Sequence, residues 1–438
     1  MNVHFLGIGG VGMSALAERL LEFGLQISGS DACNSEFVMR LLNKGIKVYI
    51  DKTPLSVIEK ADVIIYSSAI KNDDACLDYA KKLNKCIYSR GEVLGELFKV
   101  ANFSVGVAGS HGKTTATSMI ANVLKLSNLP FAAFIGGLDA TLGNYFYNGN
   151  KILISEVCEY DKNIRHITAN LSLVLNIDDD HMDTYKTIKN LKNEFFLYLD
   201  RSKTQIVNSD DALLKNHKGS NVISYGINNP SDYQAYNIIN NKGKYSFSYL
   251  MKNGEENRVE LSVYGKHNIY NALATIAVCD TLGVPHEIIK IGLNAFEGVK
   301  RRFEYLGCIN GKNIIADYCH HPEEIKATLR LAKEVFNGDY LAVFQPHTYS
   351  RTKLLFNKFL AVFKSENLVV FNEYSAREEY DYLGSAKYLS SCVENSKYFE
   401  DFNDLVNFIK QENSKNILIL GAGNLYDKIE KYTKNSKV

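Results

Sequence analysis

Residues 109–115, with the sequence GSHGKTT, constrain this chain more than any other stretch. The apolar run at residues 103–108 predicts a strand buried on both faces, and the spacing of apolar side chains over residues 116–126 predicts a helix. A strand, a glycine turn and a helix N-terminus leave several backbone N–H groups on one side of a loop, where a phosphate accepts hydrogen bonds from them. We therefore predict a phosphate-binding loop. The alternative is a glycine-rich helix start with a surface lysine.

The side chains of this loop favour ATP as its ligand. Lys113 supplies a positive charge for the terminal phosphates, and Thr114 supplies a hydroxyl group for Mg²⁺. The loop departs from the usual G-x-x-x-x-G-K-[ST] pattern, because Val107 stands in place of the first glycine. The residues of this loop that we predict to bind ATP are Gly109, Ser110, His111, Gly112, Lys113, Thr114 and Thr115.

A second glycine turn lies close to the N-terminus. Residues 3–6 predict a strand, the sequence GIGGVG follows at residues 7–12, and residues 14–23 have helical periodicity. In this pattern the first glycine allows a tight turn, the second allows close approach to a diphosphate, and the third lets the helix pack on the strand. An acidic residue about 20 residues further on binds a ribose hydroxyl. The predicted residues are Gly7, Gly9, Gly10, Gly12 and Asp31.

This N-terminal pattern alone leaves two kinds of nucleotide open. It is typical of NAD-dependent oxidoreductases, but the same backbone cradle holds any nucleoside diphosphate, including a UDP-sugar. An oxidoreductase has no need of an ATP loop a hundred residues later, so the pair of glycine turns favours the UDP-sugar. A non-catalytic nucleotide-binding switch is a third possibility.

The central segment supplies candidate metal ligands. Residues 151–157 predict a buried strand that ends near Glu156, and residues 171–177 predict another that leads into DDDH at residues 178–181. Carboxylates and a histidine at strand ends suit Mg²⁺ bound to a triphosphate. We predict Thr114, Glu156 and His181 as metal ligands; the alternatives are a solvated acidic loop and a structural histidine.

Residues 205–264 contain short alternating strands and a predicted hairpin turn at 252–254, which makes this domain partly antiparallel.

Asn268 and Asn271 then share one face of a predicted helix. Asparagine is unfavourable inside helices, so the pair suggests polar contacts, with ordinary capping as the alternative.

The C-terminal segment repeats an α/β pattern. Residues 313–318, 340–344, 368–371 and 416–420 predict strands separated by amphipathic helices. Polar residues again follow the strands, namely Asp317, His320, His321, Gln345, His347, Arg351, Glu373 and the GAGN run at 421–424.

Length and composition narrow the class of protein. A chain of 438 residues is too long for one core, so we expect two or three domains. The formal charge of +1 gives no electrostatic case for a nucleic acid or a membrane as partner. Eight scattered cysteines without a C-x-x-C pair, and no apolar run of about 18 residues, predict a cytoplasmic protein without membrane insertion.

Several longer motifs resemble the ATP-dependent Mur ligases of peptidoglycan synthesis. GSHGKTT with its shortened loop, Glu156, NIDDDHMDTY and GKHNIYNALA occur in the family's order. HFLGIGGVGMSALAE, SGSD, SSAI, FQPHTYSRT and GAGN resemble one branch of the family, and the match spans the chain from end to end. The resemblance implies a ligase that joins L-alanine to the lactyl carboxylate of UDP-N-acetylmuramate, using ATP and Mg²⁺. A sibling activity that adds a peptide or a later amino acid is the alternative.

The resemblance also implies three α/β domains that close around the substrates before chemistry. These are a Rossmann-like UDP-sugar domain at 1–98, a P-loop ATPase-like domain with an added antiparallel part at 99–297, and a Rossmann-like C-terminal domain for the amino acid and ATP at 298–438. It adds Ser67 and Ser68 to the UDP-sugar site, and Asn268, Arg302 and Asp317 to the ATP site. The implied catalytic residues are Lys113, Glu156, His181, Asn268, Asn271, Arg302 and Asp317, and the implied acceptor residues are His320, His347 and Arg351.

Two parts of the chain depart from the family pattern. Ala316 and Cys319 replace the Asp and Gly of D-D-Y-G-H-H-P, and Thr348 replaces a basic residue. A cysteine beside the site predicts thiol sensitivity, which full activity after complete alkylation of Cys319 would refute.

Overall fold

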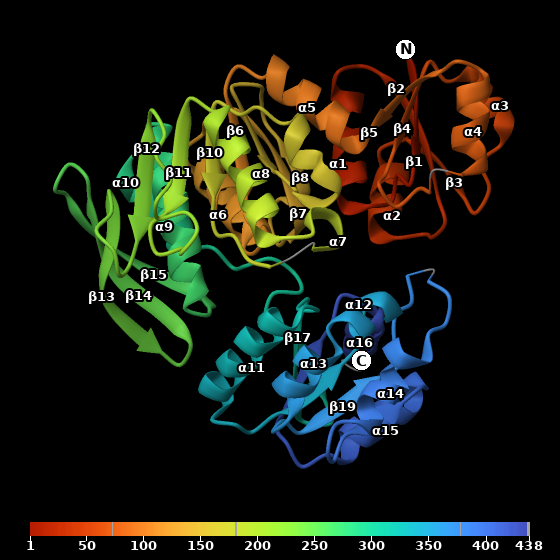
Figure 1. The fold of residues 1–438 in the computed structure, drawn as a ribbon, viewed down its shortest axis with the longest axis vertical. Helices are drawn as coiled ribbons and strands as arrows, with labels where there is room; N and C mark the ends of the chain where they lie inside the picture. Colours follow the sequence, from red (N-terminus) through yellow and green to blue (C-terminus); the bar gives the residue numbers. More distant parts are fainter. Residues whose placement is uncertain (72, 180–181, 377, 436–438) are drawn as a thin grey trace. The chain divides into compact units, whose positions relative to one another are not determined.

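The computed structural model describes residues 1–71, 73–179, 182–376 and 378–435. The chain divides into two compact units, Met1–Ile239 with Tyr245–Glu297, and Asn240–Lys244 with Gly298–Val438 (Figure 1). No helix in this described part combines the length and the apolar character that a membrane span needs.

The first sheet is parallel, with strand order β3-β2-β1-β4-β5. The order reverses at β1, because the chain moves first to β2 and β3 on one side and then to β4 and β5 on the other. Its elements are β1 (Asn2–Leu6), α1 (Val11–Glu22), β2 (Gln26–Asp31), α2 (Glu36–Asn43), β3 (Lys47–Ile50), α3 (Leu55–Lys60), β4 (Val63–Tyr66), α4 (Ala75–Lys82), β5 (Cys86–Ser89) and α5 (Arg90–Val100).

The second sheet has the strand order β15-β14-β13-β12-β11-β10-β6-β9-β7-β8. The pairs from β13 to β7 are parallel, and β8 is antiparallel to β7. Its elements are β6 (Ser104–Ala108), α6 (Lys113–Leu126), β7 (Phe131–Asp139), β8 (Gly143–Tyr147), β9 (Ile152–Glu156), the 3₁₀ helix η1 (Tyr160–His166), β10 (Leu171–Val174), α7 (Met182–Tyr185), α8 (Ile188–Asp200), β11 (Thr204–Asn208), β12 (Val222–Gly226), β13 (Tyr233–Asn241), β14 (Lys244–Met251), β15 (Glu256–Tyr264), α9 (His267–Thr281) and α10 (His286–Asn294).

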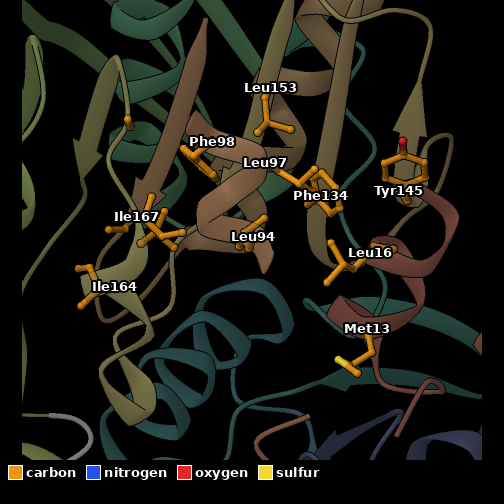
Figure 2. Close-up of a cluster of buried hydrophobic side chains, with 14 of the residues drawn as sticks. Met13, Leu16, Leu94, Leu97, Phe98, Phe134, Tyr145, Leu153, Ile164 and Ile167 are labelled. Atoms are coloured by element: carbon orange, nitrogen blue, oxygen red, sulfur yellow. The ribbon is translucent and has the colours of Figure 1, made fainter. Parts of the chain in front are cut away.

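The two sheets of the first unit share a hydrophobic core. Leu16 of α1 and Leu94 of α5 belong to the same buried cluster as Phe134 of β7 and Leu153 of β9 (Figure 2). Burying these side chains stabilises the contact by about 25 cal/mol per Å² of apolar surface. The glycine turn after β1 and the loop after β6 therefore belong to one body.

The second unit contains a sheet of order β16-β17-β21-β18-β19-β20, in which only the described β16–β17 pair is antiparallel. One hydrophobic cluster includes α11, α13 and α14, and another includes α15 and α16. The elements are β16 (Glu304–Ile309), β17 (Lys312–Asp317), α11 (Pro322–Phe336), β18 (Leu341–Phe344), α12 (Tyr349–Leu354), α13 (Phe356–Phe363), β19 (Leu368–Phe371), the 3₁₀ helix η2 (Tyr382–Gly384), α14 (Ala386–Ser391), β20 (Lys397–Phe399), α15 (Phe402–Gln411), β21 (Asn416–Leu420) and α16 (Leu425–Asn435).

Candidate functional site

The first glycine turn follows β1, where the strand order of the first sheet reverses. Open α/β sheets bind ligands at such switch points, beyond the carboxyl ends of the strands. Gly7 has a φ of 81°, which favours glycine, and a Cβ added there would lie 3.1 Å from the Cβ of Ser67. Gly10 precedes α1 as its N-cap. The structure thus brings the turn after β1 against the predicted serine after β4.

Asp31 supports this turn from the end of β2. Its Oδ2 accepts a hydrogen bond from the Gly9 backbone N–H at 2.8 Å, and its Oδ1 accepts one from Cys33 N–H at 3.2 Å. A Cβ added at Gly9 would lie 2.8 Å from Cγ2 of Val38. Asp31 therefore has a structural role that the sequence analysis did not predict, while its contact with a ribose stays a prediction.

The space beside Gly12 is occupied by an arginine. A Cβ added at Gly12 would lie 2.9 Å from Nη1 of Arg90 and 3.4 Å from its Cδ. From the sequence pattern, Gly12 is expected to let helix α1 pack on its strand. The nearest neighbours of the missing side chain show instead that Gly12 makes room for the guanidinium of Arg90.

The phosphate loop follows β6, the strand between β9 and β10 in the second sheet. Gly112, with a φ of 85°, is the N-cap of α6 in the left-handed region. Within the loop, Lys113 Nζ donates to the carbonyl groups of Gly109 and Ser110. The lysine is therefore folded back across the loop in which phosphate is predicted to bind.

Glu159 forms an ion pair with Lys113. Lys113 Nζ lies 3.0 Å and 3.1 Å from the two carboxylate oxygens of Glu159, whose side chain is fully buried. Burial is the largest single influence and by itself lowers the pKa of Lys113, but the charges of Glu159, Cys158 and Glu156 and the hydrogen bond to Glu159 together raise the pKa to about 12. Glu159 is a functional candidate that the sequence alone does not single out; its one signal is its position three residues after Glu156, just beyond a predicted buried strand.

Asn176 fixes the shape of the loop. Its Oδ1 accepts from the His111 backbone N–H at 2.8 Å, and its Nδ2 donates to the His111 carbonyl at 3.0 Å. The His111 ring nitrogen Nε2 lies 3.1 Å from Oδ2 of Asp178, so the first acidic residue after β10 also contacts the loop. Ser110 is joined to the same segment, because its hydroxyl accepts from the Asp178 N–H at 2.9 Å.

The predicted metal ligands are placed in part. Thr114 Oγ1 donates to Oε2 of Glu156 at 3.2 Å, and the other carboxylate oxygen accepts from the backbone N–H of Gly136. His181 lies outside the described residues. No group of three or more His, Cys, Asp or Glu side chains suited to a metal occurs in the described ranges. A hydroxyl and one carboxylate still fit Mg²⁺, which binds through one or two carboxylates together with substrate phosphates.

Asn268 and Asn271 lie against the phosphate loop from helix α9. Both are buried, Asn271 Nδ2 donates to Oδ1 of Asn268 at 2.8 Å, and Asn268 Nδ2 donates to the carbonyl of Tyr264 at 2.7 Å. A Cβ added at Gly112 would lie 2.7 Å from Oδ1 of Asn271. The predicted polar contacts on one helix face are therefore present.

In the second unit, Arg302 and Asp317 lie near each other. Asp317 accepts from the backbone N–H groups of Phe303 at 2.9 Å and Cys319 at 3.0 Å. Desolvation raises the pKa of Asp317, while the positive charge of Arg302 opposes the rise. The Arg302 guanidinium lies over the ring of Tyr318, 5.6 Å from its centroid.

The three predicted acceptor residues also come together. Arg351 Nη1 lies 2.9 Å from Nδ1 of His347 and donates to the His347 carbonyl at 3.3 Å. The rings of His320 and His347 are 5.9 Å apart, and Tyr374 stacks on His347 at 5.5 Å. The pKa of His347 is lowered to about 4, mainly by burial, with the charges of Arg351 and His320 acting in the same direction.

The departures from the family pattern have local explanations. Thr348 is the N-cap of α12, and its Oγ1 accepts from the Arg351 N–H at 3.4 Å. Ala316 is buried in β17. Cys319 is 1% exposed, and burial raises the pKa of its thiol. Because the thiolate is the reactive form, the predicted thiol sensitivity of Cys319 is at odds with the structure.

Comparisons with known proteins cover the whole chain. The models described as "Mur ligase family, catalytic domain", "Mur ligase middle domain" and "Mur ligase, glutamate ligase domain" match residues 2–101, 107–279 and 301–425. The chain is 39% identical to the UDP-N-acetylmuramate–L-alanine ligase of Caldanaerobacter subterraneus subsp. tengcongensis, covering 100% of the chain and 98% of that relative.

Solved structures show the same similarity. UDP-N-acetylmuramate-alanine ligase MurC from Thermotoga maritima matches with a TM-score of 0.85 at 25% identity, covering 100% of this chain and 99% of that one. A murein peptide ligase from Psychrobacter arcticus matches with a TM-score of 0.79 at 20% identity, covering 100% and 98%. The predicted three-domain α/β fold is confirmed by these matches.

Proposed function

Because this chain belongs to the Mur ligase family, we propose that it joins L-alanine to the lactyl carboxylate of UDP-N-acetylmuramate, with ATP converted to ADP and phosphate. This reaction is a step of peptidoglycan precursor synthesis, and we place it in the cytoplasm. The observation that carries the proposal is the 39% identity along the whole chain, because it covers both glycine turns and the C-terminal unit together. The family assignment replaces the oxidoreductase alternative.

The chemistry requires activation of the sugar acid. A carboxylate is a poor electrophile, because its leaving group would be oxide. A carboxylate oxygen therefore attacks the γ-phosphorus of ATP, ADP leaves, and an acyl phosphate forms. The amine of L-alanine attacks the acyl carbon and loses a proton, and phosphate departs. Both steps concentrate negative charge, so catalysis consists mainly of positioning and charge stabilisation.

Residues of the first unit supply the charge for the phosphoryl transfer. Lys113 neutralises the transferring phosphoryl group after exchanging part of its contact with Glu159 for phosphate oxygens. Thr114, Glu156 and His181 are assigned to hold Mg²⁺, with the contact between Thr114 and Glu156 in support. When bound, Mg²⁺ supplies additional positive charge to the phosphates.

We assign the remaining roles by domain. Residues 1–98 bind the UDP-sugar, residues 99–297 bind ATP, and residues 298–438 bind the amino acid and contribute to the ATP site. The residues assigned to the sugar nucleotide are Gly7, Gly9, Gly10, Gly12, Asp31, Ser67 and Ser68. Those assigned to ATP outside the loop are Asn268, Arg302 and Asp317, and Asn271 is assigned a catalytic role beside them. Those assigned to the acceptor are His320, His347 and Arg351.

The test is an acceptor screen. The protein is incubated with UDP-N-acetylmuramate, ATP and Mg²⁺ and with each amino acid in turn, and phosphate release and the mass of the product are measured. L-alanine should give the fastest release and a product heavier by one alanine residue. A peptide acceptor is included in the same screen, and a clear preference for it would replace the proposal with the sibling activity.

A further inference from the structure

Arg90, to which the sequence analysis gave no role, borders two cavities of the first unit. It begins helix α5 directly after the end of β5. One cavity, of about 210 Å³, is lined by Arg90 with Ser68 and Glu92 from the first sheet's domain and with Asn163 and His166 from η1. The other, of about 40 Å³, is lined by Arg90 with Gly12 and with Gly136 and Glu156. Arg90 therefore borders the same cavity as Gly12 of the first glycine turn and Glu156, a predicted metal ligand.

The guanidinium of Arg90 has no counter-ion in the described part of the chain. Two other arginines of this unit are paired with carboxylates: Arg40 with Glu18 at 2.8 Å, and Arg165 with Glu194 at 2.7 Å. Arg90 is partly buried, yet no described carboxylate forms an ion pair with it. Partial burial of an unpaired charge is unfavourable, and an anion that enters the cavity removes this cost. The position is thus suited to an anionic ligand.

The sugar nucleotide offers two anionic groups, a diphosphate and a lactyl carboxylate. The diphosphate already has the backbone N–H groups of the glycine turn. The carboxylate has to reach the γ-phosphate, beside Lys113 and Glu156. Gly12, Arg90 and Glu156 all border the smaller cavity, and the presence of Arg90 in the same cavity as Glu156 favours the carboxylate.

The lining of the smaller cavity strengthens such a contact. Leu16, Leu94 and Phe134 form its apolar side, and Figure 2 shows them in the core between α1, α5 and β7. Charges attract each other more strongly beside apolar walls than in water. If Arg90 did not supply a positive charge in this cavity, the carboxylate of Glu156, which also lines it, would repel the carboxylate of the substrate.

We propose that Arg90 binds the lactyl carboxylate of the sugar nucleotide and thereby selects a UDP-sugar acid over UDP-sugars that lack this group. The planar guanidinium fork matches a carboxylate with two parallel hydrogen bonds. The missing side chain at Gly12 leaves the space that the fork occupies. This proposal rests on the ligase function proposed above, and it adds a residue that determines specificity.

The test compares three ligands by calorimetry: UDP-N-acetylmuramate, UDP-N-acetylglucosamine, which lacks the lactyl group, and UDP alone. Arg90→Met should weaken binding of UDP-N-acetylmuramate about 10- to 100-fold, as expected for the loss of charged hydrogen bonds, and should leave the other two within about twofold. Arg90→Lys keeps the charge without the fork and should recover part of the loss. Arg258→Met, at an exposed position of β15, is the matched control and should change nothing.

Retained UDP binding shows that each variant is folded. Equal weakening of all three ligands would assign Arg90 to the diphosphate and overturn the proposal, as would unchanged binding of UDP-N-acetylmuramate. Failure of the ligase function is seen separately, because wild-type protein would then release no phosphate with UDP-N-acetylmuramate, ATP and L-alanine.

Discussion

Lys113 of the phosphate loop and Arg351 of the C-terminal unit are both assigned to bind substrate anions, but the protein holds the two cations differently. Lys113 contacts both oxygens of the fully buried Glu159 carboxylate. Arg351 contacts the ring nitrogen Nδ1 and the carbonyl oxygen of His347, and no described carboxylate forms an ion pair with it. One cation is compensated before substrate arrives, and the other is not.

This difference fits the anions that each cation is assigned. A phosphoryl group carries several negative charges and can compete with Glu159 for the lysine. The carboxylate of an amino acid carries a single charge, so an arginine already paired with a protein carboxylate would bind it weakly. The neutral His347 orients Arg351 without cancelling its charge, which leaves the guanidinium fork for the acceptor.

The largest expected effect is that of removing the compensated cation. Lys113→Ala should lower kcat for phosphate release at least about 1000-fold, because the transferring phosphoryl group loses its main protein charge. Binding of UDP-N-acetylmuramate, measured by calorimetry, should persist and shows that the protein is folded. Lys125→Ala, an exposed position on the same helix, is the control. Wild-type turnover in Lys113→Ala would overturn the ATP assignment.

Removing the compensating charge tests the other side of the pair. Glu159→Gln leaves Lys113 without its buried partner, so the free energy of unfolding of the protein should fall by about 3 kcal/mol in urea denaturation. Glu96→Gln removes the exposed pair of Glu96 with Lys99 and should have no measurable effect.

A double variant distinguishes the loss of the ion pair between Lys113 and Glu159 from a general disturbance of the loop. Lys113→Met combined with Glu159→Gln should lose less stability than the sum of the two single variants, since neither charge is then left alone. Strict additivity would show that the two residues do not act as a pair.

The uncompensated cation should show a smaller and more selective effect. Arg351→Lys keeps the charge and loses the fork, so KM for L-alanine should rise about 10-fold while KM for ATP stays within about twofold. Arg330→Lys, at an exposed position of α11, serves as the control for the same exchange. Equal rises in KM for L-alanine and ATP would remove the assignment of Arg351 to the acceptor.

The two regions also differ in what the sequence could predict. The phosphate loop is continuous in sequence and its strand and helix have clear periodicity, so Lys113 and Thr114 could be assigned directly. Its partners could not, because Glu159 and Asn176 lie on later segments and only the register of β6, β9 and β10 brings them to the loop. The family resemblance grouped His320 and His347 with Arg351, and the structure places these three residues together, but the resemblance could not show the lowered pKa of His347, which depends on burial.

Other differences between the structure and the predictions from sequence have similar causes. The predicted strand over 171–177 ends at Val174, because the residues that follow leave the sheet to form the site. Strand β7 was not predicted, since Gly136 and its neighbouring glycine interrupt the apolar pattern. A binding role for Arg90 could not be predicted from the sequence, because Arg90 follows Ser89, whose capping box with Glu92 is typical of an ordinary helix start.

The smallest expected effect concerns the neutral histidine that supports Arg351. The pKa of His347 is about 4 in the folded protein and 6.5 in the unfolded chain, so the unfolded state binds the proton first as pH falls. The stability contributed by neutral His347 is therefore complete above pH 6.5 and lost as pH falls toward 4, by about 1 to 2 kcal/mol between pH 7 and 5. In urea denaturation at these two pH values, His347→Gln should show a correspondingly smaller pH dependence than wild type. An identical slope in both proteins would mean that His347 has the same pKa in the folded and unfolded states, so that at pH 5 Arg351 would lie beside a second cation.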